Sequence, residues 1–141
     1  MVKLFRWLKY WRQILTSLWR LQWQTQTIRR RVGAKAELRA LYYLHKMGLQ
    51  FEAANYFCRQ GELDLIMWDD DVLVFVEVRY RQRGDFVLPA HSVNLNKQRK
   101  VIRAAHRYLK ANPCYRQAPY RFDIVALQGQ REICWYKFAF L

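Results

Sequence analysis

Hydrophobic residues recur three or four positions apart near the start of the chain, in residues 3–23, with cationic and polar residues on the opposite face. The hydrophobic positions are Leu4, Trp7, Trp11, Ile14, Leu18 and Leu21. This pattern predicts an amphipathic helix. A mostly polar stretch from Gln22 to Thr27 follows it. We therefore place a domain boundary near residue 32, with residues 1–32 as a basic amphipathic helix and linker and residues 33–141 as the folded domain.

A second helix is predicted from Ala34 to Met47, where small and apolar residues share one face and Gly48 provides a natural stop. Three runs with strand-like patterning follow it, separated by Gly61 and by an acidic turn at residues 69–71. The predicted strands are Phe51–Cys58, Glu62–Trp68 and Val72–Tyr80. The last two are expected to form a hairpin.

The second half of the chain predicts one long helix and two further strands. The helix spans roughly Leu95–Ala111 and ends at an Asn-Pro pair, and the strands cover Arg121–Leu127 and Ile133–Lys137. The element order of the folded domain is therefore αβββαββ, which places it in the α/β class.

Composition supports a folded domain with a strong preference for anions. Hydrophobic residues make up 52% of the chain and aromatic residues 16%, which argues against a disordered protein. The net charge of +14 implies attraction to polyanions, either nucleic acid or an anionic membrane surface. Charge alone does not choose between them.

The cysteines and the first residues of the chain suggest a cytoplasmic location. Cys58, Cys114 and Cys134 are widely spaced and form no C-x-x-C pair, so neither a disulfide framework nor a zinc site is expected. Cations interrupt every hydrophobic run within the first 31 residues. We therefore expect no transmembrane helix and no signal peptide, although peripheral attachment to a membrane stays open.

Acidic residues on the predicted hairpin are the candidate chemistry. Strand alternation places Glu62 and Asp64 on one face, together with Ile66, and Glu77 and Arg79 on one face of the next strand. A tight turn at residues 70 and 71 would set Asp64 opposite Glu77 and Glu62 opposite Arg79. Opposed carboxylates destabilise a sheet unless a cation lies between them. Alternatively, Glu62 pairs with Arg79, and the other two acids lie at solvated strand edges.

Four segments in order resemble the bacterial YraN family over about residues 33–138. They are Gly61–Ile66, Val74–Arg81, the pair Lys97-Gln98, and Arg121–Ala126. This family is similar to the restriction-endonuclease-like superfamily, which includes archaeal Holliday-junction resolvases. The resemblance implies an αβββαββ core with a mixed central sheet flanked by helices.

The resemblance also implies roles for particular residues. The superfamily site has an acid on the first helix, an Asp and a Glu-x-Lys, and the matching positions are Glu37, Asp64, Glu77 and Arg79. Asp64 and Glu77 would hold Mg²⁺ or Mn²⁺, and Glu37 would be an outer ligand or hold water. Arg79 would stabilise the phosphorane. For Glu37 the alternative is an ordinary carboxylate in a first helical turn.

One departure from the superfamily pattern affects the expected chemistry, because Arg79 stands where a lysine is expected. Lysine can lose a proton when buried, whereas arginine stays charged and only stabilises charge or holds a phosphate. Both an active enzyme and a module that binds without cutting therefore remain open.

Basic residues on the long helix suggest a nucleic-acid surface. Lys100, Arg103 and Arg107 recur along it at helical spacing, and Arg81 and Arg83 would extend the track from the acidic residues. A solvated helix face is the alternative reading. Accessory roles in the site are expected for Glu62, Lys97 and Gln98.

The favoured function is a Mg²⁺-dependent endonuclease acting on structured or branched DNA, and the alternative is a non-catalytic nucleic-acid-binding protein of the same fold. No small-molecule cofactor is expected. Residues 3–23 are expected to mediate homo-oligomerisation first and attachment to a membrane surface second. Asp123 is expected to be structural, with Arg121 as a possible partner.

Overall fold

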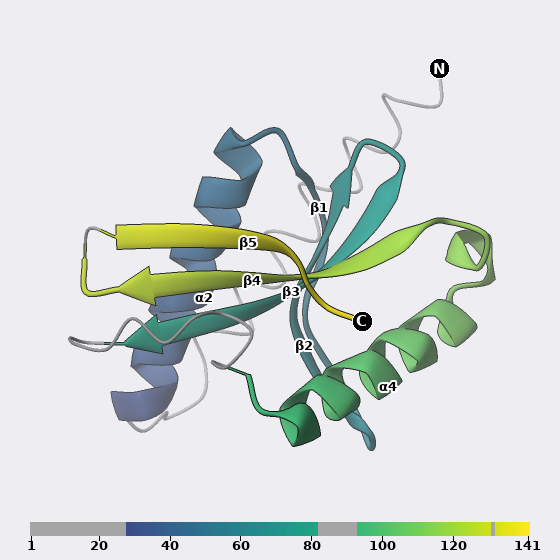
Figure 1. The fold of residues 1–141 in the computed structure, drawn as a ribbon, viewed down its shortest axis with the longest axis horizontal. Helices are drawn as coiled ribbons and strands as arrows, with labels where there is room; N and C mark the ends of the chain where they lie inside the picture. The colour runs from purple at the N-terminus through teal and green to yellow at the C-terminus, as the bar shows by residue number, and fades with distance from the viewer. Residues whose placement is uncertain (1–27, 82–92, 131) are drawn as a thin grey trace.

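A five-stranded sheet is the centre of the computed structural model, which describes residues 28–81, 93–130 and 132–141 (Figure 1). The predicted helix over residues 3–23 and Arg83 lie outside the described residues. The described elements are α2 (Ile28–Lys46), β1 (Gln50–Cys58), β2 (Gly61–Asp69), β3 (Val72–Arg81), α4 (Leu95–Ala111), the 3₁₀ turn η1 (Pro113–Tyr115), β4 (Tyr120–Gln128) and β5 (Glu132–Phe140).

The sheet is mixed, with strands in the order β1-β2-β3-β4-β5. Strands β3 and β4 are parallel, while the β1–β2, β2–β3 and β4–β5 pairs are antiparallel. Parallel neighbours need a crossover connection, and α4 lies within this one. The predicted αβββαββ order and mixed sheet are thus confirmed, consistent with a restriction-endonuclease-like α/β fold.

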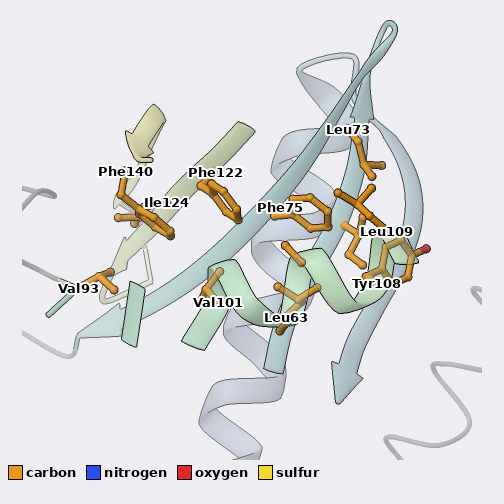
Figure 2. Close-up of a cluster of buried hydrophobic side chains, with 13 residues drawn as sticks. Leu63, Leu73, Phe75, Val93, Val101, Tyr108, Leu109, Phe122, Ile124 and Phe140 are labelled. Carbon is orange, nitrogen blue, oxygen red and sulfur yellow. The ribbon is translucent and has the colours of Figure 1, made fainter. Parts of the chain in front are cut away.

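Two apolar clusters fill the two faces of the sheet. On one face, α4 packs Val101, Ala104 and Tyr108 against Phe75 and neighbouring residues (Figure 2). The buried members of this α4-side cluster are Leu63, Ile66, Leu73, Phe75, Val93, Val101, Ala104, Ala105, Tyr108, Leu109, Phe122, Ile124 and Phe140. On the opposite face, the small side chains of α2 and Leu44 pack against apolar residues of the sheet. The buried members of this α2-side cluster are Ala36, Ala40, Leu44, Leu49, Phe51, Leu65, Met67, Val74, Val76, Val125 and Leu127. The helices therefore cover opposite faces, as Figure 1 shows. This buried sheet holds the ends of β2 and β3 in fixed positions.

Helix α2 begins at Ile28, earlier than the predicted start at Ala34. Gly33 suggested a start, but it lies inside the helix, and a Cβ built there would meet no atom within 4 Å. A single interior glycine costs only about 0.5–1 kcal/mol relative to alanine, which does not end a helix. The predicted stop is confirmed, because the helix ends at Lys46, one residue before the predicted Met47, and Gly48 then has a φ of 99°.

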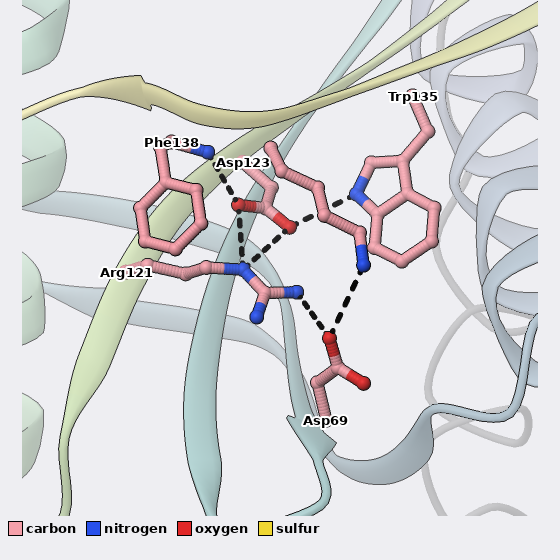
Figure 3. Close-up of polar contacts among 6 residues, drawn as sticks. Asp69, Arg121, Asp123, Trp135 and Phe138 are labelled. Atoms are coloured by element: carbon pink, nitrogen blue, oxygen red, sulfur yellow. Dashed lines mark hydrogen bonds and ion pairs between the residues drawn. The ribbon is translucent and has the colours of Figure 1, made fainter.

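A network of charged side chains joins β2, β4 and β5 (Figure 3). Arg121 contacts Asp69 at 2.7 Å and Asp123 at 3.0 Å. Asp123 is fully buried and also accepts hydrogen bonds from the Trp135 indole and the Phe138 amide, at 2.9 Å and 3.1 Å. Of the two structural roles open for Asp123, capping or pairing with Arg121, the structure shows the pairing.

The last strand is longer than the sequence predicts. Strand β5 continues to Phe140 instead of ending at Lys137, passing through Phe138 with a φ of 53°. The Phe138 amide bonds to the buried Asp123 carboxylate, which supports this irregular backbone. The three cysteines are free thiols. Across residues 28–81, 93–130 and 132–141, no helix is long and apolar enough to cross a membrane.

Candidate acidic active site

The site lies where the ladder between β2 and β3 ends. The hairpin turns at Asp70 and Asp71 as predicted, because Asp69 pairs with Val72, and the paired positions continue to Leu65↔Val76. Extending this register by one position puts Asp64 opposite Glu77, as the sequence predicts. The Val78 amide there donates a hydrogen bond of 2.8 Å to Oδ2 of Asp64. The Asp64 side chain thus acts as an acceptor where the backbone ladder stops.

Face alternation is interrupted at this point, which corrects the prediction that Glu62, Asp64 and Ile66 share one face. Leu63 and Ile66 both pack in the α4-side cluster although an odd number of positions separates them. Strand β1 shows the same interruption, because Ala53 and Tyr56 both pack on the α4 side.

The cause of the interruption in β1 is Asn55, which has a φ of 53°. Asparagine is one of the few residues that adopts this left-handed conformation readily. Asn55 and Asp64 lie between the paired positions Ala54↔Leu65 and Tyr56↔Leu63. Both strands are therefore irregular at the same level of the sheet, beside the acidic residues.

Glu77 is the buried centre of the site, with a 3% exposed side chain. The Lys97 ammonium lies 3.3 Å from Oε2 of Glu77 and 3.1 Å from Oε1 of Glu62. On the other side, Nε of Arg79 lies 3.6 Å from Oε1 of Glu77. Residues from β2, β3 and α4 thus form one mixed cluster of opposite charges.

The carboxylates of the site have raised pKa values. Burial, followed by repulsion from Asp64, raises the pKa of Glu77 to about 7. Burial also raises the pKa of Asp64, despite the opposing hydrogen bond from Val78. The pKa of Glu37 rises to about 7 for the same two reasons as Glu77, although a hydrogen bond with Asn55 opposes the rise. Glu37 on α2 is therefore electrostatically linked to Asp64 and, more weakly, to Glu62 on β2.

Lys97 remains a cation in this setting. Burial acts to lower its pKa, but attraction to Glu77, Asp64 and Glu62 outweighs burial, so the Lys97 pKa is raised. Its ammonium is the second cation of the site beside the Arg79 guanidinium.

The structure brings most of the predicted site residues together and separates a few. Glu62 forms its ion pair with Lys97, which favours the acidic-site interpretation over the pairing of Glu62 with Arg79. The Gln98 amide instead donates to the Val93 carbonyl at 2.8 Å. The predicted nucleic-acid residues in the described ranges, Arg81, Lys100, Arg103 and Arg107, are exposed.

Sequence reasoning missed Asn55 and the role of Gly61. A Cβ on Gly61 would lie 2.8 Å from the carbonyl oxygen of Lys100, so only glycine permits this approach of the β1–β2 turn to α4. Gly61 precedes Glu62 directly, and Lys97 lies one helical turn before Lys100. The signal for both residues was their type: a glycine before the acidic strand and an asparagine inside a strand pattern.

The residues that could hold a divalent cation are Asp64 and Glu77. Oε2 of Glu77 is buried, and within the described residues it lies 3.3 Å from the Lys97 ammonium. In the same part of the chain, no three acidic, histidine or cysteine side chains are grouped around one metal position.

Known proteins match this chain across the site. The model of the family described as "Uncharacterised protein family UPF0102" matches residues 36–127, a range that contains Glu37, Asp64, Glu77 and Lys97. A UPF0102 protein of Pseudomonas putida (strain GB-1) is 46% identical over 114 residues, covering 78% of this chain and 93% of the relative. One from Coxiella burnetii (strain RSA 331 / Henzerling II) is 42% identical over 111 residues, covering 79% and 92%. One from Psychromonas ingrahamii is 48% identical over 99 residues, covering 70% and 79%.

Proposed function

Since this chain belongs to the uncharacterised protein family UPF0102, the YraN family that its motifs resemble, we propose that it is a Mg²⁺-dependent endonuclease acting on structured or branched DNA. The observation that carries the proposal is the buried Glu77 carboxylate, raised in pKa beside Asp64 and contacted by the cations of Lys97 and Arg79. Perturbed acids grouped with cations are typical of catalytic sites.

The donor set fits a magnesium ion. Mg²⁺ is usually held by one or two carboxylates and completes its coordination with waters and substrate phosphates. A grouping of three protein ligands is therefore not required. The buried Oε2 of Glu77 has capacity for a further partner, and a divalent cation would relieve its repulsion with Asp64. When bound, the ion would lower the pKa of a water and neutralise phosphate charge.

The remaining residues of the site have roles that follow from their charges. Glu37, with a pKa of about 7, can hold a water molecule and accept a proton near neutral pH. Arg79 and Lys97 would stabilise the charge that develops on the phosphate. The raised Lys97 pKa supports a role as a permanent cation instead of a proton acceptor.

Helix α4 connects the acidic site to a basic surface. Lys97 in its first turn enters the site, and Lys100, Arg103 and Arg107 are exposed farther along. Exposed cations repeated along one helix suit contact with successive phosphates. A phosphodiester strand that followed α4 would therefore be led to the carboxylates.

A second candidate function is nucleic-acid binding without cleavage. Arg79 favours it, because arginine replaces the lysine of the superfamily pattern and cannot exchange a proton at neutral pH. The basic surface would be retained in such a protein, and only the chemical step would be lost.

A cleavage assay separates the two candidates. Branched and linear DNA are incubated with the full chain in Mg²⁺, in Mn²⁺ and in EDTA, and the same is done with Glu77→Gln. Glu132→Gln, at an exposed position on β5, removes the same charge away from the site and is the control. Cleavage that needs the metal and is lost only in Glu77→Gln supports the nuclease. Binding without cleavage by all three proteins supports the second candidate.

A further inference from the structure

A cavity of about 420 Å³ lies between α2, the end of β3 and the turn from β4 to β5. It is lined by Val32, Lys35, Ala36, Arg39, Tyr80 and Gln130. These lining residues include two cations, one aromatic ring and two apolar side chains, but no carboxylate. Ligand pockets commonly combine apolar walls with a few placed polar groups in this way.

Arg39 is held in one orientation at the wall of this cavity. Its Nη1 donates to the Gly129 carbonyl at 2.7 Å, and its Nη2 donates to the Gln130 carbonyl at 2.8 Å. Carbonyl groups satisfy the donors without neutralising the positive charge. With the exposed Lys35 four positions earlier on the same helix, Arg39 gives the cavity a preference for an anion.

Tyr80 adds an aromatic surface to the cationic wall. It is half-buried and packs against the α2-side cluster. Aromatic side chains provide stacking surfaces for nucleobases, and cations beside them hold the phosphates. Tyr80, Lys35 and Arg39 together match the chemistry of one nucleotide, which carries both a flat base and an anionic phosphate.

The cavity and the acidic site take residues from the same two elements, α2 and β3. Lys35 and Arg39 lie two positions to either side of Glu37 on α2, and Tyr80 follows Arg79 on β3. Arg79 contacts Glu77, whereas Tyr80 packs on the α2 side of the sheet. Arg79 and Tyr80, consecutive residues of β3, thus belong to the acidic site and to the cavity, on opposite faces of the sheet. A nucleic-acid strand that passed around the end of β3 would contact both.

We propose that this cavity binds one nucleotide of a nucleic-acid strand, next to the phosphate at the acidic site, with the base against Tyr80 and the phosphate between Lys35 and Arg39. The inference rests on the proposed function and specifies how the substrate strand is held. It predicts a preference for nucleic acid with an unstacked nucleotide, since a base in a duplex stack cannot enter a cavity.

Binding in EDTA tests the proposal without any cleavage step. Labelled single-stranded, branched and duplex oligonucleotides are titrated with the full chain, with Lys35→Gln and with Lys46→Gln. Lys46 is an exposed residue on the same helix, away from the cavity, so its variant is a control of equal charge. Lys35→Gln is expected to weaken binding of the single-stranded and branched probes by about three- to tenfold, and Lys46→Gln by less than about twofold.

Photo-crosslinking identifies the cavity directly. A single-stranded oligonucleotide carrying 5-iodouracil is expected to crosslink to Tyr80 and to the ring in Tyr80→Phe, and Tyr80→Leu is expected to lose the crosslink. Equal weakening by Lys35→Gln and Lys46→Gln, together with no crosslink at Tyr80, would overturn the cavity assignment and leave the proposed nuclease intact. Binding of a mononucleotide with the same Lys35 dependence, but of no oligonucleotide, would overturn the strand assignment. No binding of any probe by the wild-type chain, in EDTA and again after Mg²⁺ is added, would overturn both proposals.

Discussion

The Lys97 ammonium lies 3.3 Å from Oε2 of Glu77, and this contact joins the first turn of α4 to the middle of the sheet. Glu77 is followed along the chain by the rest of β3 and by residues 82–94 before α4 begins. The cation of this pair is therefore supplied by a separate element from the Glu-x-Arg motif. The contact balances part of the negative charge that Asp64 and Glu77 place on one another.

Replacing Lys97 tests this balance. Lys97→Met is expected to raise the Glu77 pKa further above its usual range, because the attraction that opposes burial is lost. NMR titration of the side-chain carboxyl carbons measures it. Any Mg²⁺-dependent cleavage is expected to fall at least about tenfold. Lys97→Arg is the control and should retain the lower Glu77 pKa. An unchanged titration in Lys97→Met would contradict the electrostatic role.

The raised Glu77 pKa predicts how stability depends on pH in the metal-free protein. The folded state binds the Glu77 proton more tightly than the unfolded state, so folding is favoured at low pH and this advantage is lost as pH rises from about 4.5 through about 7. Glu77→Gln should match wild type near pH 4.5 and exceed it by about 1–3 kcal/mol in free energy of unfolding at pH 8.

Urea denaturation at several pH values measures this difference, with Glu132→Gln as the exposed control. Adding Mg²⁺ at pH 8 is expected to reduce the advantage of Glu77→Gln, because the cation would stabilise the wild-type carboxylates. A stability difference that is the same at every pH would show that the Glu77 charge is not responsible.

Gly61 is predicted to set the position of Lys97. In Gly61→Ala the new Cβ would lie 2.8 Å from the Lys100 carbonyl oxygen, so either the turn or α4 must move. We expect a loss of about 1–3 kcal/mol in the free energy of unfolding and weaker cleavage. Gly33→Ala is the matched control, because its Cβ meets nothing within 4 Å. Within a helix that change should stabilise by about 0.5–1 kcal/mol. Equal effects of the two variants would argue against the close approach.

The exposed cations of α4 are predicted to set the salt dependence of DNA binding. Replacing Lys100, Arg103 and Arg107 with Ala should reduce the slope of log affinity against log salt by about 2.7 for duplex DNA, if each residue contacts one phosphate. Fluorescence anisotropy at several salt concentrations measures the slope. A double variant of the exposed residues Lys46 and Arg116 is the comparison. An unchanged slope in the triple variant would place the binding surface elsewhere.

Arg121 is predicted to be essential for stability. Arg121→Met leaves the fully buried Asp123 carboxylate without its cation, which should cost about 3–5 kcal/mol in the free energy of unfolding. Combining Arg121→Met with Asp123→Leu removes the buried charge that has lost its cation. The double variant should recover part of the lost free energy of unfolding. Thermal and urea denaturation measure both proteins. A double variant less stable than Arg121→Met would indicate that the hydrogen bonds from Trp135 and Phe138 to Asp123, not its charge pairing, dominate this network.

The strongest sequence patterns predicted the fold well. The bounds of α4 match the prediction of Leu95–Ala111, because its apolar face is regular and Asn94 and Asn112 cap its two ends. The β2–β3 turn also matches at Asp70 and Asp71, although β2 extends one residue beyond the predicted Trp68, to Asp69. Both features are determined by local sequence, which explains why the pattern of residues along this chain predicted them.

The residues that complete the candidate site could not be predicted in the same way. Lys97 contacts Glu62 and Glu77 because of where α4 packs on the sheet. That position depends on the close approach of the α4 backbone to Gly61. The irregularity at Asn55 also changes which face each neighbouring side chain occupies. Strict period-two alternation carries no information about such a position.

The hydrogen bond from the Val78 amide to Asp64 limits how that carboxylate can coordinate a cation. Oδ2 is already an acceptor for the main chain, so an ion that took both oxygens of Asp64 would compete with this amide. Monodentate coordination through Oδ1 is the arrangement that preserves the bond. A compact octahedral ion such as Mg²⁺ suits this denticity, whereas Ca²⁺ takes more oxygens and often binds carboxylates through both. If the proposed cation binds here, the hydrogen bond at the end of the β2–β3 ladder would therefore favour the smaller ion.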